Sequence, residues 1–148
     1  MWYKISNEAE VFTPSVLLYP NRIKENIRRM ITIAGDVSRL RPHVKTHKMA
    51  EVVQMQVQLG ITKFKCATLT EMEMTAASGG TDILLAYPVF GPAIRKYFSI
   101  VKKYPQVKFS VLVDNEKSIA ELTDEAQHQK QKAAVFIDID NGMHRTGI

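Results

Sequence analysis

Short apolar runs alternate with amphipathic stretches from one end of this 148-residue chain to the other. The runs are rich in β-branched and aromatic side chains, which are typical of strands, and they are bounded by turn residues. They predict six β-strands, at residues 15–19, 39–45, 62–68, 82–87, 108–114 and 133–140.

Between these runs, apolar residues recur three and four positions apart, which is the spacing of one helix face. Thr68 and Glu71 have the spacing of a capping box, which predicts that a helix begins there. Glycine belongs at helix C-termini, and proline belongs in the first turn. We expect five helices: one closed by Gly35, one over 47–59, one ended by Gly79 and Gly80, one between Pro92 and Pro105, and one over about 115–128.

Strands that alternate with helices through short loops form parallel sheets with helical crossovers. Two architectures satisfy this pattern: an open doubly wound sheet, and a (β/α)8 barrel, which typically needs about 250 residues. If the barrel is correct, the chain is an incomplete TIM barrel of about six βα units.

Composition narrows the class of protein. The chain is 45% hydrophobic and 24% charged, which is the globular range, and it has no apolar run of the ~18 residues that a membrane span needs. The single cysteine, Cys66, cannot form a disulfide within the chain, which favours a reducing, cytoplasmic setting. The net charge is +5, but the basic residues are spread over the outer faces of predicted helices, so we expect neither nucleic-acid binding nor membrane binding.

The segment RPHVKTHK, residues 41–48, concentrates two histidines and two lysines. His43 and His47 have the spacing of zinc ligands in the motif H-E-x-x-H, but Val44 replaces the glutamate and no third ligand is near. In an extended strand the two histidines would lie more than ~12 Å apart, too far to share a metal. We therefore expect no metal site there.

Two interpretations of the segment remain. The histidines and lysines can be ordinary loop residues. Alternatively, Lys45 lies at the carboxyl end of a strand, where ligands of parallel α/β folds collect and where a partly desolvated lysine becomes a usable amine. Lys48, one helical step further on, is expected to be more exposed.

A second polar run, DIDNGMHRTG, follows the last predicted strand. Asp138 and Asp140 could bind magnesium or flank a glycosidic bond, but such carboxylates more often cap a loop or pair with arginine. Gly142 and Gly147 permit tight turns. Arg145 offers a permanent cation and a planar donor fork for an oxyanion or a phenolate.

RPHVKTHK, followed about a hundred residues later by DIDNGMHRTG, resembles the fold-type III pyridoxal-phosphate enzymes, and among them the D-threonine aldolase and D-serine dehydratase group. Alanine racemase is a more distant relative with a similar barrel. The resemblance runs from TPSVLLY through CATLTEME and DILLAYPVFGP to Gly147. It implies an α/β fold similar to the alanine racemase N-terminal domain, that is, an incomplete (β/α)8 TIM barrel.

The resemblance also implies a site. Lys45 would form a Schiff base with pyridoxal 5'-phosphate, and Arg145 would approach the phenolic oxygen of the cofactor. Enzymes of this group continue with the last barrel strands, a phosphate-binding loop and a C-terminal β domain that carries the ligands of a divalent metal. We expect these parts to lie beyond residues 1–148, which would form the N-terminal part of the barrel, so no metal ligand is assigned.

The activity implied is that of a lyase acting on small D-β-hydroxy amino acids, with D-threonine aldolase as the first expectation. D-serine dehydratase or deaminase, an amino-acid racemase and a non-catalytic pyridoxal-phosphate carrier are the alternatives. Residues 1–148 alone should be inactive. Unpaired apolar edges at 15–19 and 136–140 favour association, so we expect a homo-oligomer, most simply a dimer, or a larger parent protein.

Overall fold

The computed structural model describes residues 3–148. Four parallel strands form one sheet in the order β1-β2-β3-β4. Their bounds are β1 Lys63–Cys66, β2 Asp82–Leu85, β3 Lys108–Val113 and β4 Ala134–Ile137. The α-helices are α1 Pro20–Ala34, α2 Ala50–Gln58, α3 Leu69–Ala77, α4 Pro92–Lys103 and α5 Glu116–His128, and the 3-10 helices are η1 Glu8–Glu10, η2 Val37–Arg39 and η3 Val44–Thr46.

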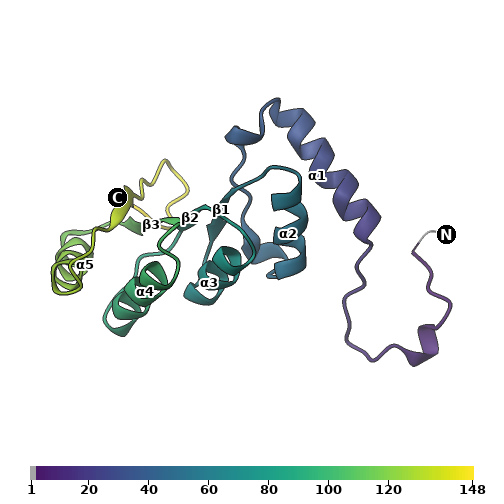
Figure 1. The fold of residues 1–148 in the computed structure, drawn as a ribbon, viewed down its shortest axis with the longest axis horizontal. Helices are drawn as coiled ribbons and strands as arrows, with labels where there is room; N and C mark the ends of the chain where they lie inside the picture. The colour runs from purple at the N-terminus through teal and green to yellow at the C-terminus, as the bar shows by residue number, and fades with distance from the viewer. Residues whose placement is uncertain (1–2) are drawn as a thin grey trace.

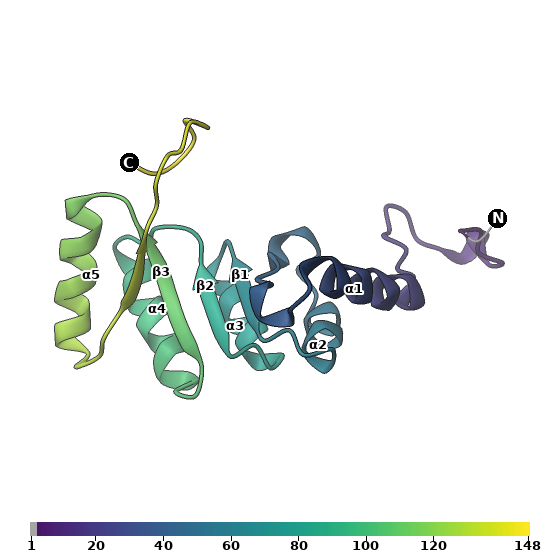
Figure 2. The same cartoon turned by 90° about the horizontal axis from the view of Figure 1, so that it is seen from above.

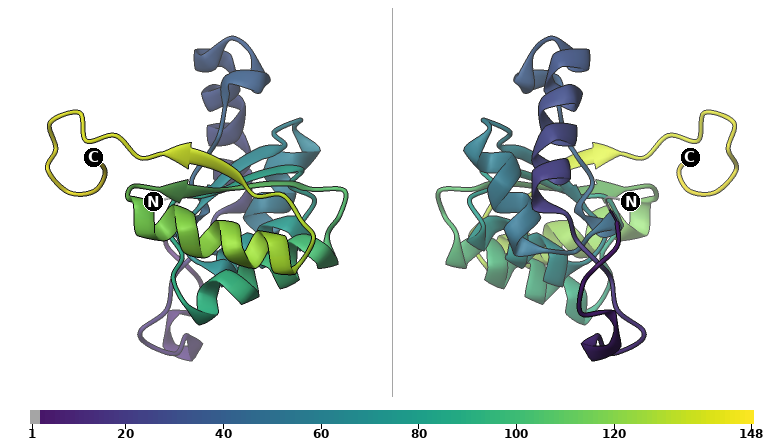
Figure 3. Two further views of the ribbon diagram at one scale, coloured as in Figure 1. Left: turned by 90° about the vertical axis from the view of Figure 1, so that its left-hand side faces the viewer. Right: turned by 90° about the vertical axis from the view of Figure 1, so that its right-hand side faces the viewer.

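The sheet is wound as part of a barrel. Each of α3, α4 and α5 joins two neighbouring parallel strands, and all three lie on the same side of the sheet (Figures 1 and 3). A doubly wound sheet would place helices on both faces, whereas a barrel keeps them outside and its strands in sequential order. The predicted α/β fold class and partial barrel are therefore confirmed.

Local signals in the sequence set the helix ends. Pro20 is the first residue of α1, and Gly35 closes it at φ 75°, with its N–H 3.0 Å from the Ile31 carbonyl oxygen. Thr68 caps α3, because its hydroxyl oxygen accepts the N–H of Glu71 at 3.1 Å, as the capping box predicts. All five predicted helices form, although α2 begins three residues later than expected.

The core lies between the sheet and the helices. Alternate strand residues point to this layer and are fully buried, among them Phe64, Ile83 and Val111. Tyr97 and Phe98 of α4 pack edge to face there, with ring centroids 5.2 Å apart. Each such side chain contributes about 1.5–3 kcal/mol by leaving water. The strand residues that alternate with these buried ones, such as Lys65 and Leu112, therefore face the opposite, open side of the sheet.

Two of the six predicted strands do not form within the described residues. Residues 15–19 have no sheet partner, and Val16 is 78% exposed. A strand needs a neighbour for its backbone groups, so an apolar run without one stays irregular. Residues 39–45 share one β-bridge with the sheet, between His43 and Lys65, but do not form a strand of it. Pro42 lacks an N–H to donate, and 3-10 turns occupy both ends of the run.

At the other edge, β4 pairs with β3 alone in the described chain, as expected. Its residues Val135, Phe136 and Ile137 are 47–61% exposed. The loop after β4 projects beyond the carboxyl end of that strand (Figure 2). Oligomerisation through this edge stays a prediction. Across residues 3–148, no helix has both the length and the apolar character required to cross a membrane.

Candidate functional site

A cleft of about 460 Å³ opens on the open side of the sheet, at the carboxyl ends of the strands. It is lined by residues from every strand or its following loop, and both predicted site residues, Lys45 and Arg145, are among them. Ligands of parallel α/β folds bind at this end of the sheet. Its charged and aromatic lining residues are His43, Lys45, Lys65, Tyr87, Asp138 and Arg145.

Lys45 lies in the turn η3, two residues after the bridge that ties His43 to β1. Its backbone N–H donates to His43 Nδ1 at 3.2 Å. Its side chain is exposed, so the expected partial desolvation is not seen, and its ammonium has no hydrogen bond or ion pair with any described residue. Lys45 therefore presents an unpaired ammonium to the cleft.

Lys48 is held elsewhere. Its Nζ lies 3.2 Å from Glu71 Oε1, and the Glu71 side chain is only 5% exposed. The other carboxylate oxygen, Oε2, accepts the N–H of Ala67 at 2.8 Å. Glu71 thus ties the segment that carries Lys45 to the start of α3. Sequence reasoning paired Glu71 with Thr68 in a capping box, but it missed the bond from the Ala67 N–H and the pairing with Lys48, which joins residues 23 positions apart.

Both histidines organise the turn. The Nδ1 atoms of His43 and His47 accept the backbone N–H groups of Lys45 and Met49, at 3.2 and 3.1 Å. Burial lowers the pKa of both imidazoles, and the charges of Lys45 and Lys65 lower that of His43 further. Both rings are therefore neutral near pH 7. Within residues 3–148, no three His, Cys, Asp or Glu side chains come together so as to hold a metal ion.

The loop after β4 is built around Asp140. Its Oδ1 accepts the N–H groups of His144 and Gly142, both at 2.9 Å, and its Oδ2 lies 2.9 Å from His144 Nδ1. These hydrogen bonds, chiefly that from the His144 backbone, lower the pKa of Asp140. Asp140 is therefore the loop cap that the sequence predicts.

The ends of the same loop are tied together. Ile148 N–H donates to the Asp138 carbonyl oxygen, and Asp140 N–H to the Ile148 carbonyl oxygen, both at 3.0 Å. Gly147 sits inside this closure at φ 98°, where a Cβ would lie 2.6 Å from Asp140 N. Only glycine fits there. The closure holds the preceding Arg145 at the cleft, where its side chain makes no ion pair with a described residue.

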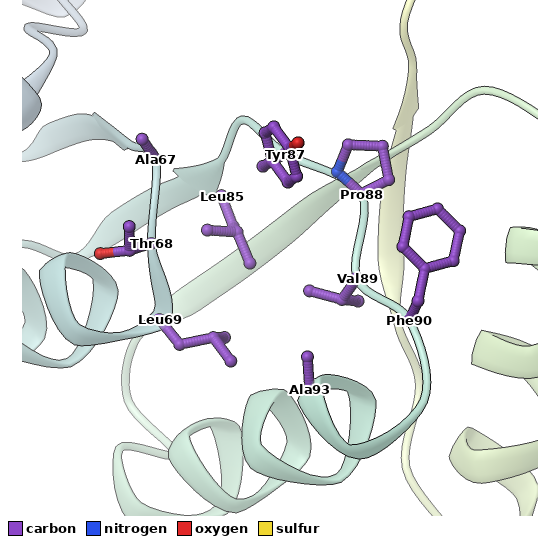
Figure 4. A pocket seen from close by; sticks show the side chains of 9 residues that line it. All are labelled: Ala67, Thr68, Leu69, Leu85, Tyr87, Pro88, Val89, Phe90 and Ala93. Carbon is purple, nitrogen blue, oxygen red and sulfur yellow. The ribbon is translucent and has the colours of Figure 1, made fainter.

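Sequence reasoning did not single out Lys65 or Tyr87 as site residues. The signal for Lys65 was present, because Phe64 and Cys66 beside it are apolar and a strand alternates its faces. Tyr87 and Pro88 also line a neighbouring pocket of about 320 Å³, between the sheet and the first turns of α3 and α4 (Figure 4). The side chains around that pocket carry no charge, so the cleft with Lys45 is the better candidate for chemistry.

Residues 19–148 match the family model described as "Alanine racemase, N-terminal domain". The chain is 32% identical to the D-threonine aldolase of Arthrobacter sp. over 142 residues, which is 95% of this chain and 37% of that protein. It is 30% identical to the D-threo-3-hydroxyaspartate dehydratase of Delftia sp. over 137 residues, 92% of this chain and 36% of that protein. The crystal structure of D-threonine aldolase from Filomicrobium marinum superimposes with a TM-score of 0.83 at 26% identity, over 95% of this chain and 38% of that one. The chain thus spans less than two-fifths of each relative's length.

Proposed function

Because the chain belongs to the family of the alanine racemase N-terminal domain, we propose that it forms the N-terminal part of a pyridoxal-phosphate-dependent lyase that acts on D-β-hydroxy amino acids. The observation that carries this proposal is that Lys45 and Arg145 line the same cleft, although 100 positions separate them in the chain. Relatives named as an aldolase and as a dehydratase of such amino acids support the reaction class.

The residues of the cleft fit the cofactor. Pyridoxal phosphate offers an aldehyde, a phenolate oxygen and a phosphate, and it needs an amine and cations around it. The cleft supplies the unpaired amine of Lys45, the guanidinium of Arg145 and the ammonium of Lys65, against the single carboxylate of Asp138. When bound, the cofactor serves as an electron sink for the bond that breaks at the substrate's α-carbon.

In this proposal each residue has a defined task. Lys45 would hold the cofactor through its aldehyde, because its side chain makes no hydrogen bond or ion pair with a described residue. Lys48 is set aside by its ion pair with Glu71. Arg145 would donate to the phenolate oxygen of the cofactor through its planar fork. His43, neutral and bonded to the Lys45 N–H, holds the turn in shape.

Between the two lyase reactions, we propose retro-aldol cleavage first and dehydration as the second candidate. Cleavage breaks the bond between Cα and Cβ, whereas dehydration removes the α-proton and then the β-hydroxyl. The similarity to the two relatives is close to equal, at 32% and 30% identity. The proposal assigns no divalent-metal ligand to these 148 residues.

One substrate separates the candidates. Incubation of the full-length, cofactor-loaded protein with D-threonine should release glycine and acetaldehyde if it is an aldolase, and 2-oxobutanoate and ammonia if it is a dehydratase. The Lys45→Ala variant should lose either activity, whereas Lys48→Ala should retain most of it. If wild-type protein converts neither D-threonine nor D-serine, the lyase proposal is wrong, and bound cofactor without turnover would indicate a carrier.

A further inference from the structure

Lys65 faces the cleft from β1. Its neighbours Phe64 and Cys66 are both 0% exposed and point to the helices, so the pleat turns Lys65 to the open side of the sheet. Its backbone is held by the bridge to His43, in which the Lys65 N–H donates to the Pro42 carbonyl oxygen at 2.9 Å. The side chain is partly buried and lines the same cleft as Lys45 and Arg145.

The ammonium of Lys65 has no counter-charge in the described chain. Lys63 provides the contrast, because it lies on the same face two residues earlier and its Nζ donates to the Ser38 carbonyl oxygen at 2.8 Å. Lys65 makes no such bond and no ion pair with the one carboxylate of the cleft, that of Asp138. Burial is the main cause of the lowered pKa of His43, and the nearby charges of Lys45 and Lys65 lower that pKa further.

An unpaired, partly buried ammonium is unfavourable unless an anion joins it. In the proposed function, the amine of Lys45 and the fork of Arg145 are already committed to the cofactor's aldehyde and phenolate. Lys65 is the remaining cation of the cleft, and an ammonium suits a compact oxyanion. We propose that Lys65 binds an oxyanion of the bound ligands, either the carboxylate of the amino-acid substrate or the phosphate of the cofactor. This inference rests on the proposed function and deepens it.

The test compares Lys65→Met with Lys63→Met in the full-length protein. Both variants remove an ammonium from the same strand face and keep an unbranched apolar stem. One arm titrates cofactor-free protein with pyridoxal phosphate, and with inorganic phosphate as a competitor. The other arm measures the KM for D-threonine with saturating cofactor. Lys65→Arg, which keeps the cation, is the rescue variant and guards against loss of folding.

Because Lys65→Met removes a charge-assisted hydrogen bond, we expect it to raise either the cofactor Kd or the KM for D-threonine at least ~10-fold. Lys63→Met should change neither constant. A higher cofactor Kd, together with loss of competition by inorganic phosphate, assigns Lys65 to the cofactor's phosphate. A raised KM with an unchanged cofactor Kd assigns it to the substrate carboxylate. Constants for Lys65→Met equal to those of Lys63→Met in both arms overturn the inference.

The proposed function and the role of Lys65 can be refuted independently of each other. Borohydride fixation of the cofactor on Lys45 is measured in the same Lys65→Met protein, and it should persist, because Lys65 does not form that bond. If wild-type protein shows no fixation at Lys45, the proposed function is wrong. The titration with inorganic phosphate alone still reports whether Lys65 binds an oxyanion.

Discussion

Replacing Glu71 with alanine should destabilise the protein and loosen the segment that carries Lys45. The carboxylate is 5% exposed, accepts the Ala67 N–H at 2.8 Å and lies 3.2 Å from Lys48 Nζ. A hydrogen bond to a charged group contributes about 1.5–3 kcal/mol. The Lys48 side chain is 62% exposed, so its ion pair adds less than about 1 kcal/mol. We expect Glu71→Ala to lower the free energy of unfolding by about 2–3 kcal/mol.

Urea unfolding followed by circular dichroism measures this loss in the full-length protein. Glu71→Gln keeps an acceptor oxygen for Ala67 and should cost about 1 kcal/mol. Glu73→Ala is the matched control on the same helix, because Glu73 pairs with Lys96 and Lys103 on the exposed side and should cost less than about 1 kcal/mol.

Equal stabilities of Glu71→Ala and Glu73→Ala would refute the role given to Glu71.

Three further predictions follow from the site and the sheet. Arg145→Lys keeps the charge but loses the fork, so lyase activity should fall at least ~10-fold, and wild-type kinetics would refute the role of Arg145. Gly147→Ala should weaken cofactor binding at least ~10-fold in a titration, since its Cβ would meet backbone at 2.6 Å, whereas Gly142→Ala, with nothing within 4 Å of a Cβ, should weaken it less; equal effects would contradict the closure. Burial raises the pKa of Asp82, but the hydrogen bond and charge of Arg41 outweigh it and leave the pKa lowered. The carboxylate form therefore stabilises the fold fully above about pH 4, and its contribution is lost as the pH falls through the lowered pKa. The difference in unfolding free energy between wild type and Asp82→Asn should shrink from pH 5 to pH 3, and a constant difference would count against this pairing.

Much of the fold follows from local patterns. Strands β1 to β4 and the five helices form where alternation, helical periodicity and caps predict them, because each of those strands finds a neighbour. The run 15–19 has the same local pattern and stays irregular, because no described segment pairs with it. Strand formation depends on a partner distant in sequence, which periodicity does not contain.

The sequence likewise predicted one part of the candidate site and missed another. The similarity of residues 19–148 to the alanine racemase N-terminal domain confirms the family inferred from RPHVKTHK and DIDNGMHRTG. Parallel topology brings Lys45 and Arg145 to one cleft, and local hydrogen bonds make Asp140 a loop cap. The pairing of Lys48 with Glu71 and the isolation of Lys65 depend on side-chain positions across the fold, which no local pattern reports.

The central claim is that Lys45, and not Lys48, holds the cofactor, and fixation by borohydride tests it most directly. The full-length protein loaded with pyridoxal phosphate should be yellow, and reduction should attach the cofactor permanently to one lysine. Peptide mapping should find the label on Lys45, because its amine is free at the cleft while Glu71 holds that of Lys48. A label on Lys48, or cofactor that is lost on denaturation after reduction, would contradict the account.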